Sequence, residues 1–416
     1  MFAGMVAVLL ASSLVSVYPD TAALHAQVQA GTLLQNHGVI ATCDVCDSEI
    51  VTEAQGSAAP MTTVVPVGYS ASELAAAYHL PASGGVAGTV ALVDGGGYPG
   101  FESDLAAYRS QFGLPACTVA SGCLKVVDYQ GGPPLHPDGT DEEKQLSLET
   151  ALDAQMISAA CPACKILLVQ APTRDFYLSS LHTATDAVPS IARAVSTAVA
   201  AGVSAVSMSF GYPSTKDINT GPMSTVFSHP GIAFVASSGD SGYHGNVHGY
   251  WPQNLPSVIS AGGTALYQTS DGFASNAWSG AGSACETDLP PANGQPAAVA
   301  AVCGGHRASS DVSAVSDPAT GVAVYDSYAA GGWYTVGGTS AAAPFIAALY
   351  ARGGHLSRVD GPNTLYAAPA GAFSDVTLGQ NAAAHGCQPT SLQLCVSGTG
   401  WDGPTGVGTP NGLAGF

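Results

Sequence analysis

The stretch from Gly337 to Gly354 reads GGTSAAAPFIAALYARGG. Its two opening glycines allow a sharp backbone turn, and the apolar run that follows predicts a buried helix ending at the closing glycine pair. Ser340 then lies at the helix N-terminus, where free backbone N–H groups can stabilise the oxyanion that forms when a serine attacks a carbonyl. The alternative is that Thr339 or Ser340 only caps the helix.

Short apolar runs alternate with helical segments along the chain before this stretch. Buried strands are predicted at 89–94, 165–170, 203–210, 232–237 and 258–261, and helices at 101–112, 143–160 and 189–201. This alternation predicts an α/β fold, with one parallel sheet and helices on both faces in a single large domain. In such sheets, functional residues gather beyond the carboxyl ends of the strands.

The composition of the 416-residue chain is strongly acidic, with 29 Asp and Glu against 10 Lys and Arg and a net charge of -19. That charge argues against binding to nucleic acid, whose phosphates would repel it. It favours an acidic habitat, because most carboxylates are neutral at low pH and few basic groups remain to repel one another. A soluble acidic exoprotein that works near neutrality is the alternative.

The beginning of the chain has the character of an export sequence. Residues 2–18 are almost wholly apolar or small, so residues 1–26 are interpreted as a secretory signal peptide, with possible cleavage after Ala23, Ala26 or Ala30. The apolar run is short for a membrane span, and no later segment reaches the required length.

Residues 27–65 are polar, rich in Ala and Thr, and weakly periodic. This composition predicts a linker or a remnant propeptide, with order beginning at Pro66. Ser70 or Ser72 can then cap a first helix that leads to Tyr78.

Ten cysteines fall into five neighbouring pairs, which in an exported chain indicates disulfides that close small loops. The two C-x-x-C pairs could instead be halves of a zinc site. The pairs are 43/46, 117/123, 161/164, 285/303 and 387/395.

Two acidic residues lie four apart in the helix predicted at 143–160. Glu149 and Asp153 must share one face, which continues through Met156 and Ile157 and so turns inward. Like charges at this spacing repel each other, so a helix selected for stability alone would avoid the pair. A solvated acidic face is the alternative.

A third acidic residue follows the strand predicted at 232–237, where the chain continues as SGDSG. Asp240 therefore lies at the carboxyl end of a strand, in a glycine-rich turn. It could act in a site there, or it could only stabilise its own turn.

Together these segments resemble the sedolisin family of serine-carboxyl peptidases, from about Pro66 to the C-terminus. The resemblance implies a subtilisin-like fold for a peptidase domain at 66–416. It also implies that Glu149 is the general base, Asp153 its partner, Ser340 the nucleophile and Asp240 the oxyanion-hole donor. The matching motifs, in the family's order, are Glu149-x-x-x-Asp153, Cys161-Pro162, Ser237-Ser238-Gly239-Asp240 and Gly338-Thr339-Ser340 through Pro344.

These implied roles suit an acidic pH. Near pH 4 a histidine base would be almost fully protonated, whereas a glutamate with a pKa of about 4.3 is partly ionised and can accept the serine proton. Asp240 must be protonated to donate a hydrogen bond to an oxyanion, because an ionised carboxylate would repel it.

A subtilisin is the competing interpretation, because the strand before Asp94 resembles the one that carries a subtilisin's aspartate. A His-Gly-Thr-His segment opening a helix should follow, and the sequence has none. His136 lies in a proline-rich segment, and Glu149 occupies the helix where the missing histidine would be. Asp94 could join a hydrogen-bond chain behind Glu149 and Asp153, or it could cap its own strand.

The segment 373–408 combines acidic residues with glycines, which allow several carbonyl oxygens to face a hard cation such as Ca²⁺. A glycine-rich surface turn is the alternative. The segment resembles the sedolisin calcium site, which implies one structural ion held by the side chains of Asp375 and Asp402 and the carbonyls of Val376, Gly398 and Gly400.

The sequence thus predicts a secreted, monomeric serine-carboxyl peptidase that cleaves protein or peptide substrates at acidic pH and contacts neither nucleic acid nor, after signal removal, a membrane. A secreted non-catalytic binding protein on a protease-like scaffold and a subtilisin-type protease are the alternatives. Subsite preference and the maturation point lie in loop geometry that the sequence does not define.

Overall fold

A computed structural model describes residues 37–41, 43–54, 65–177, 184–243, 249–329, 331–382, 386–387 and 392–416. The segment predicted to be a signal peptide lies outside these ranges. None of the helices in the described ranges is both long and apolar enough to cross a membrane.

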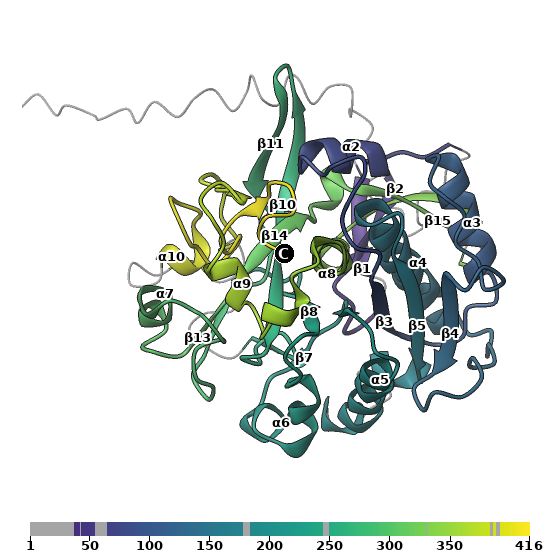
Figure 1. Cartoon of the computed structure of the whole chain (residues 1–416), viewed down its shortest axis with the longest axis horizontal. Coiled ribbons are helices and arrows are strands. Elements are labelled where there is room, and N and C mark those ends of the chain that lie inside the picture. Colours follow the sequence, from purple (N-terminus) through teal and green to yellow (C-terminus); the bar gives the residue numbers. More distant parts are fainter. Residues whose placement is uncertain are drawn as a thin grey trace, which may run out of the picture.

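An eight-stranded sheet forms the centre of the fold (Figure 1). Its strand order is β11-β10-β8-β6-β3-β5-β4, with β14 beside β10. All these neighbours are parallel except β10 and β11, so the predicted α/β fold with a parallel sheet is confirmed. The strands are β3 (Thr89–Gly95), β4 (Leu124–Asp128), β5 (Lys165–Ala171), β6 (Ala205–Met208), β8 (Ala233–Ser237), β10 (Val258–Thr269), β11 (Gly272–Ala277) and β14 (Val312–Val315).

Helices cover both faces of this sheet, as the alternation of elements predicts. Helices α4 (Asp141–Ala160) and α8 (Thr339–Gly353) pack against one face and against each other, and α5 (Val188–Ala200) packs against the other. In β3, Leu92 belongs to the core on the α4 and α8 side, whereas the next residue, Val93, belongs to the core on the α5 side. Successive side chains of a strand point to opposite faces, so burial on both faces explains its continuous apolar run.

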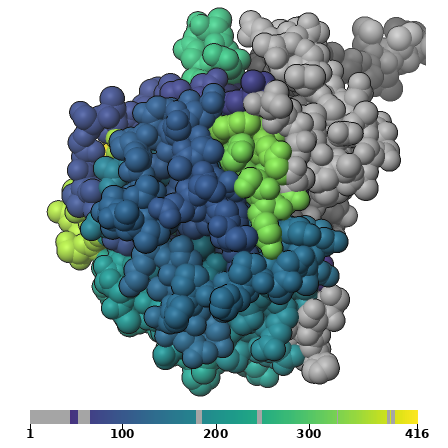
Figure 2. Space-filling model, turned by 90° about the vertical axis from the view of Figure 1, so that its right-hand side faces the viewer, coloured from purple at the N-terminus to yellow at the C-terminus, as the bar shows by residue number. Residues whose placement is uncertain are grey.

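Two shorter helices extend the layer of α4. Helix α2 (Ala71–Ala77) begins at Ser70, whose side chain accepts from the N–H of Glu73 while the Glu73 side chain accepts from the Ser70 N–H. Helix α3 (Phe101–Gln111) packs on α4 and on β15 (Val322–Asp326). Figure 2 shows this side of the molecule, with the blue residues of the first half of the chain beside a light-green patch.

Residues 37–41 and 43–54 form ordered structure, contrary to the expectation that order begins at Pro66. Strands β1 (His37–Ala41) and β2 (Glu49–Ala54) join β16 (Gly332–Gly337) and β15 in a second, four-stranded antiparallel sheet. Ile50 is buried in the core on the α4 side. The strand partner lies almost three hundred residues away in the sequence, so the local pattern could not reveal it.

Strand β10 extends past its predicted end at 261 and pairs with β11 in a long hairpin that projects from the molecule (Figure 1). Two glycines follow residue 261 within this strand. They lie where a side chain would overlap neighbours, Gly262 against the Pro404 carbonyl and Gly263 against the side chain of Ser316.

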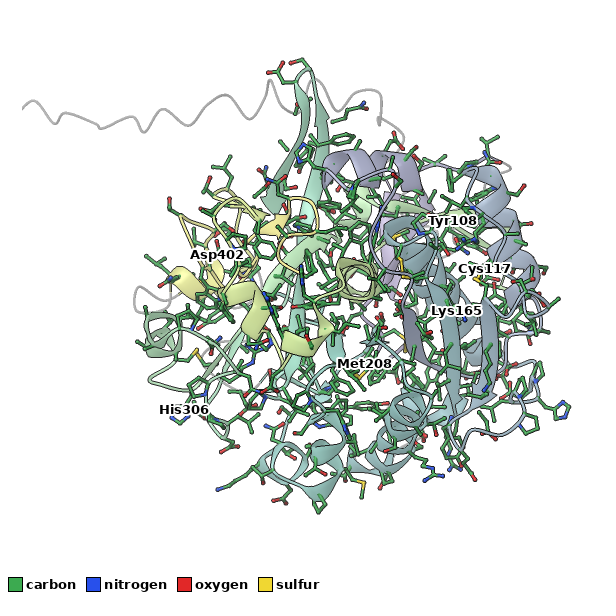
Figure 3. The ribbon with its side chains drawn as sticks, in the orientation of Figure 1. Tyr108, Cys117, Lys165, Met208, His306 and Asp402 are labelled. Atoms are coloured by element: carbon green, nitrogen blue, oxygen red, sulfur yellow. A yellow bond between two sulfur atoms is a disulfide. The ribbon has the colours of Figure 1, made fainter. Side chains whose placement is uncertain are left out.

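All ten cysteines form disulfides in the five neighbouring pairs that the sequence predicts. Figure 3 labels Cys117, which is bonded to Cys123. The alternative that the C-x-x-C pairs hold zinc is therefore wrong in this structure.

Short elements complete the fold, and several of them form the C-terminal segment that is yellow in Figure 1. They are β7 (Tyr212–Pro213), β9 (Tyr250–Trp251), β12 (Ala284–Glu286), β13 (Arg307–Ser309), β17 (Phe373–Ser374), β18 (Thr409–Pro410), α6 (Lys216–Asn219), α7 (Ala297–Val302), α9 (Asn363–Tyr366) and α10 (Leu392–Cys395).

Candidate active site

Ser340 lies in the first turn of α8, after the sharp turn that the glycines predict. Gly338 has a φ of 100°, and a side chain there would overlap the carbonyl oxygen of Asp47 and the carboxyl group of Asp240. Ser340 is fully buried. Its N–H donates to the Asp47 carbonyl at 2.7 Å, and its Oγ donates to the carbonyl of Ser209 at 3.3 Å.

Glu149 and Asp153 point inward from α4 and are 2% and 0% exposed. This burial excludes the solvated acidic face that was the alternative. The Oγ of Ser209 donates to both carboxyl oxygens of Asp153, at 2.8 and 2.9 Å, and the Oγ of Ser48 donates to Oε2 of Glu149. Ser209 thus links Asp153 to Ser340, because its own carbonyl accepts from the Ser340 hydroxyl.

Asp94, in β3, adds a third buried carboxyl group beside this pair. Burial raises the pKa of Asp94 well above its ordinary value, and the charge of Glu149 raises it further. Burial also raises the pKa of Asp153, as do the charges of Asp94 and Glu149. Within the described ranges neither aspartate forms an ion pair, so the cluster retains protons at acidic pH.

Asp240 lies on the opposite side of the α8 N-terminus, three residues after β8. Its Oδ1 accepts from the backbone N–H and the hydroxyl of Thr339, each at 2.8 Å. Burial raises the pKa of Asp240 well above its ordinary value, and the charges of Asp47 and Glu49 add to the effect. Its Oδ2 lies against Gly338, as does the carbonyl oxygen of Asp47. A protonated Asp240 can therefore donate toward that carbonyl.

A segment of the chain itself, residues 43–49, crosses this site between two sets of backbone partners. The carbonyl of Val45 accepts from the N–H of Gly211 at 2.9 Å, and the N–H of Asp47 donates to the carbonyl of Ser209 at 3.3 Å. On the other side, Glu49 pairs with Gly337 in β16. The site therefore holds a peptide by backbone hydrogen bonds on both of its edges.

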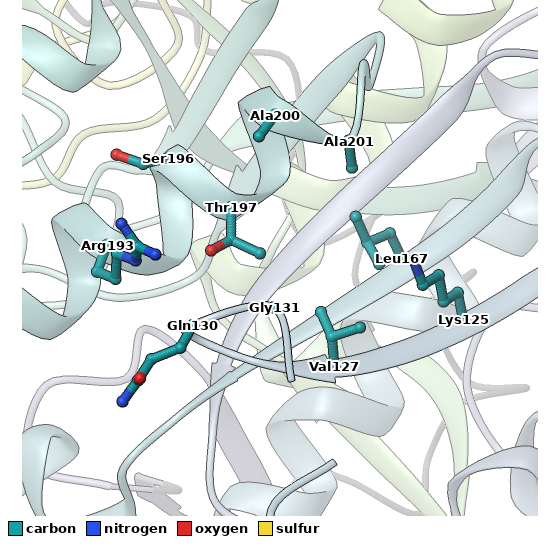
Figure 4. A pocket seen from close by; sticks show the side chains of 10 residues that line it. All are labelled: Lys125, Val127, Gln130, Gly131, Leu167, Arg193, Ser196, Thr197, Ala200 and Ala201. Atoms are coloured by element: carbon teal, nitrogen blue, oxygen red, sulfur yellow. The ribbon is translucent and has the colours of Figure 1, made fainter. Parts of the chain in front are cut away.

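A cavity of about 180 Å³ lies at this segment, between residues 43–49 and the side chains or backbone of Gly211, Asp240, Ser241 and Tyr250. Figure 4 shows a different pocket, of about 310 Å³, between the strands β4 and β5 and the helix α5. None of the predicted catalytic residues lines the pocket of Figure 4.

Sequence reasoning did not single out Ser48, Ser209 or Thr339 as contacts of the acidic residues. Ser209 follows β6 and precedes Phe210-Gly211, so its place at the carboxyl end of a parallel strand could have identified it. No local pattern marks Ser48, which reaches Glu149 only through tertiary pairing. In the part of the chain that the structure describes, the side-chain contacts of Asp153 and Ser340 include no histidine.

The predicted calcium ligands lie together in the C-terminal segment, away from the catalytic residues; Figure 3 labels Asp402 there and Met208 near the centre of the molecule. Oδ2 of Asp375 accepts from the N–H of Gly400 at 2.9 Å, and Oδ2 of Asp402 accepts from the N–H of Gly398 at 3.0 Å. Both carboxyl groups therefore hold the same glycine-containing loop.

These oxygen donors suit a hard cation, and neither Gly398 nor Gly400 has a neighbouring atom where a side chain would be, so the loop is open there. Val376, the remaining predicted ligand, is buried beside Asp375. Among the described residues no three His, Cys, Asp or Glu side chains gather closely enough to hold a metal. An ion at this loop would therefore depend on backbone carbonyls.

Comparison with known proteins supports the sedolisin resemblance. Kumamolisin from Bacillus sp. (strain MN-32) is 31% identical over 383 residues, which cover 84% of this chain and 63% of kumamolisin. Sedolisin from Pseudomonas sp. (strain 101) is 29% identical over 211 residues, which cover 43% of this chain and 33% of sedolisin. This chain therefore spans less than two thirds of the length of either relative.

The structure is also similar to that of Pseudomonas sedolisin, a serine-carboxyl proteinase, in complex with two molecules of pseudo-iodotyrostatin. The TM-score is 0.65 at 24% identity, with 83% of this chain and 96% of the other covered, which shows a common fold. No protein-family model matches the chain. The chain is therefore similar to members of the sedolisin family, and it shares the subtilisin-like fold of Pseudomonas sedolisin.

Proposed function

We propose that this protein is a secreted serine-carboxyl peptidase that hydrolyses peptide bonds at acidic pH. One observation carries the proposal: two adjacent residues of the segment 43–49 contact the two residues that must act together, Ser340 and Glu149. Asp47 accepts through its carbonyl from the N–H of Ser340, and Ser48 donates through its hydroxyl to Glu149. These two contacts support the assignment of Ser340 as the nucleophile and Glu149 as the base, on the two sides of one peptide bond.

In the proposed mechanism, the Oγ of Ser340 attacks the carbonyl carbon and Glu149 accepts its proton. Asp153 lies one helical turn from Glu149 in the same buried cluster and can share that proton. Glu149 then donates the proton to the leaving amine, and a water molecule hydrolyses the acyl ester on Ser340 by the reverse steps.

Asp240 has the role of stabilising the oxyanion together with the N–H of Ser340. Because burial raises the pKa of Asp240 well above its ordinary value, its carboxyl group stays neutral in acid and can donate a hydrogen bond. Ionisation at higher pH would replace this donor by a negative charge. Activity should therefore be lost as the pH rises, while a carboxylate base, unlike an imidazole, permits activity in acid.

The calcium site is a separate part of the proposal. The side chains of Asp375 and Asp402 and the carbonyls of Val376, Gly398 and Gly400 would hold one ion. Bound there, the ion would neutralise the two carboxylates and tie the C-terminal loops together. Export to an oxidising compartment is supported by the five disulfides.

The decisive test is casein hydrolysis across about pH 3 to 8 by the wild-type protein and by Ser340→Ala. We expect a peak of activity in acid for the wild type and none for the variant, with unchanged circular dichroism. A neutral peak would favour a subtilisin-like mechanism. Activity that survives in Ser340→Ala would refute the assignment of the nucleophile, and an inactive wild type would favour a binding protein on this scaffold.

A further inference from the structure

The segment of residues 43–50, which leads into β2, is seated in the active site in one defined register. Its backbone pairs with residues 209–211 on one side and with β16 on the other. The disulfide between Cys43 and Cys46 closes a small ring just before the catalytic residues, and Cys46 forms a β-bridge with Phe210. This register places the peptide bond between Asp47 and Ser48 at Ser340.

The reacting groups lie on that bond rather than on a neighbouring one. The carbonyl oxygen of Asp47 accepts from the N–H of Ser340 at 2.7 Å, and it lies against Gly338 on the same side as Oδ2 of Asp240. The next residue, Ser48, bonds to the proposed base Glu149. A carbonyl held by oxyanion donors with a base beside the leaving group is the geometry of a bound substrate.

The side chain of Asp47 occupies a small polar pocket. It is 7% exposed, and its Oδ2 accepts a hydrogen bond from the Oγ of Ser237, which is fully buried at the end of β8. No cation pairs with Asp47 in the described ranges, and the titratable groups that face it are Asp240 and Tyr250.

This pocket disfavours a negative charge. Burial raises the pKa of Asp47 to about 7, although the Ser237 hydrogen bond opposes the shift. The pocket therefore suits a short, uncharged side chain with an oxygen acceptor for the Ser237 hydroxyl. A protonated Asp has these properties, and so does Asn.

Building on the proposed peptidase function, we propose that the chain cleaves its own Asp47–Ser48 bond, and that the site prefers peptides with Asp or Asn on the amino side of the cleaved bond. Ser237 is the residue that sets this preference. The segment at 43–49 then contains the self-cleavage site, and other peptide substrates bind in the same position after it has been cleaved.

The chemistry uses only the protein and water. Ser340 Oγ forms an ester with the Asp47 carbonyl carbon, its proton passes to Glu149, and the bond to the Ser48 nitrogen breaks as that nitrogen receives the proton. Water then hydrolyses the ester, which leaves a carboxyl group on Asp47 and restores Ser340. No covalent bond then joins the segment that ends at Asp47 to the rest of the chain, because the Cys43–Cys46 disulfide lies wholly within that segment.

Self-cleavage is tested by incubating the purified full chain in acid, followed by intact mass and N-terminal sequencing. We expect a product that begins at Ser48, and no product from Ser340→Ala. Asp47→Asn should cleave at a rate close to wild type, whereas Asp47→Leu should be slowed about tenfold or more because it removes the carboxyl acceptor of the buried Ser237 hydroxyl and leaves only the longer bond to the Met208 carbonyl. The same change at the exposed Asp44, three residues earlier, is the matched control and should have little effect. A product that begins elsewhere, or an unslowed Asp47→Leu, would overturn the inference.

Preference is tested separately with three peptides that differ only in Asp, Asn or Leu before the cleaved bond. The processed enzyme should cleave the Asp and Asn peptides about tenfold faster than the Leu peptide in kcat/KM. In Ser237→Ala this ratio should fall toward one. Equal cleavage of all three peptides would overturn the inference and leave the proposed peptidase intact, whereas cleavage of none would overturn both.

Discussion

Two groups of buried carboxylates in this molecule are neutralised in different ways. Asp311 is fully buried and pairs with the equally buried guanidinium of Arg307 at 2.6 Å, and it also accepts from the hydroxyl of Tyr366 and the N–H of Ser260. Burial alone would lower the pKa of Arg307, but the charge and hydrogen bonds of Asp311 raise it. This region is a permanent ion pair that joins β10, β13 and α9.

Asp94 and Asp153 are buried to nearly the same degree and Asp240 is partly buried, yet the described contacts of these three residues include no cation. Burial raises the pKa of each of these groups, so they are neutralised by protons. A proton can be transferred during a reaction, whereas the charge of a guanidinium cannot. The comparison indicates that the first region serves stability and the second serves chemistry.

The largest effect that tests this contrast is on catalysis. Glu149→Gln keeps the shape of the side chain but cannot accept the serine proton, so kcat/KM should fall by roughly 10² to 10⁴. Thermal stability should change little. Peptide hydrolysis at the acidic optimum measures kcat/KM, and calorimetry measures thermal stability.

Glu143→Gln is the matched control, because Glu143 is also buried on α4 but bonds to the backbone N–H groups of Gly97 and Gly139. It should lose stability and keep most of its activity. If the two variants lose activity equally, the special role of Glu149 is wrong.

Removal of the carboxylate from the ion pair should have the largest effect on stability. Asp311→Asn leaves the buried guanidinium of Arg307 without its counter-charge, which should cost about 3 to 5 kcal/mol in the free energy of unfolding. Asp153→Asn, at the same burial, should cost less than about 1 kcal/mol because that carboxyl group is already protonated in acid. Urea denaturation at pH 4 compares the two, and similar losses would contradict the distinction.

Protonation should also make stability depend on pH. A group whose pKa is raised by folding holds its proton longer in the folded state, so its contribution is complete below its ordinary value and is lost as the pH rises through the folded value. Burial is the main cause that raises the pKa of Asp47 from 3.8, and the pKa of Glu49 from 4.5, to about 7 in each case. For the buried Asp47 this shift corresponds to a stability contribution on the order of 4 kcal/mol.

The uncleaved Ser340→Ala protein should therefore be most stable near pH 4 and should lose stability toward pH 7 and above. Calorimetry across this window measures the loss. Stability that rises from pH 4 to 7 would show that the carboxyl groups of the site are ionised.

The smallest expected effect concerns the C-terminal segment, where a cation from solution is proposed to neutralise the carboxylates of Asp375 and Asp402. Removal of calcium by a chelator should lower the melting temperature by a few degrees, corresponding to roughly 1 to 3 kcal/mol for a bound ion present above its Kd. Asp402→Asn should remove the response to calcium. A purified preparation without calcium and with an unchanged melting curve would remove the ion from the proposal.

The sequence predicted most of the central fold because its signals are local. Continuous apolar runs predicted the parallel strands β3, β5, β6 and β8, and glycines marked both ends of α8. Spacing within one helix was sufficient to place Glu149 and Asp153 on one inward face. Neighbouring cysteines were also sufficient for the disulfides, because short loops bring their partners together.

Contacts between distant segments could not be predicted in this way. The sequence of residues 43–50 resembles a linker, and it is held in place because β16 and residues 209–211 provide backbone partners. The bonds of Ser48 to Glu149 and of Ser237 to Asp47 likewise join residues that lie about one hundred or more positions apart.

The sequence by itself therefore determined the α/β architecture, the positions of the acidic residues on their elements and the place of Ser340 at a helix N-terminus. These features follow from hydrophobic periodicity and backbone turns, which act over a few residues. Only the tertiary structure decided which carboxyl groups share protons, which one pairs with a guanidinium and which peptide bond lies at Ser340. Those outcomes depend on burial and on hydrogen bonds across the sheet, and both arise only when the chain has folded.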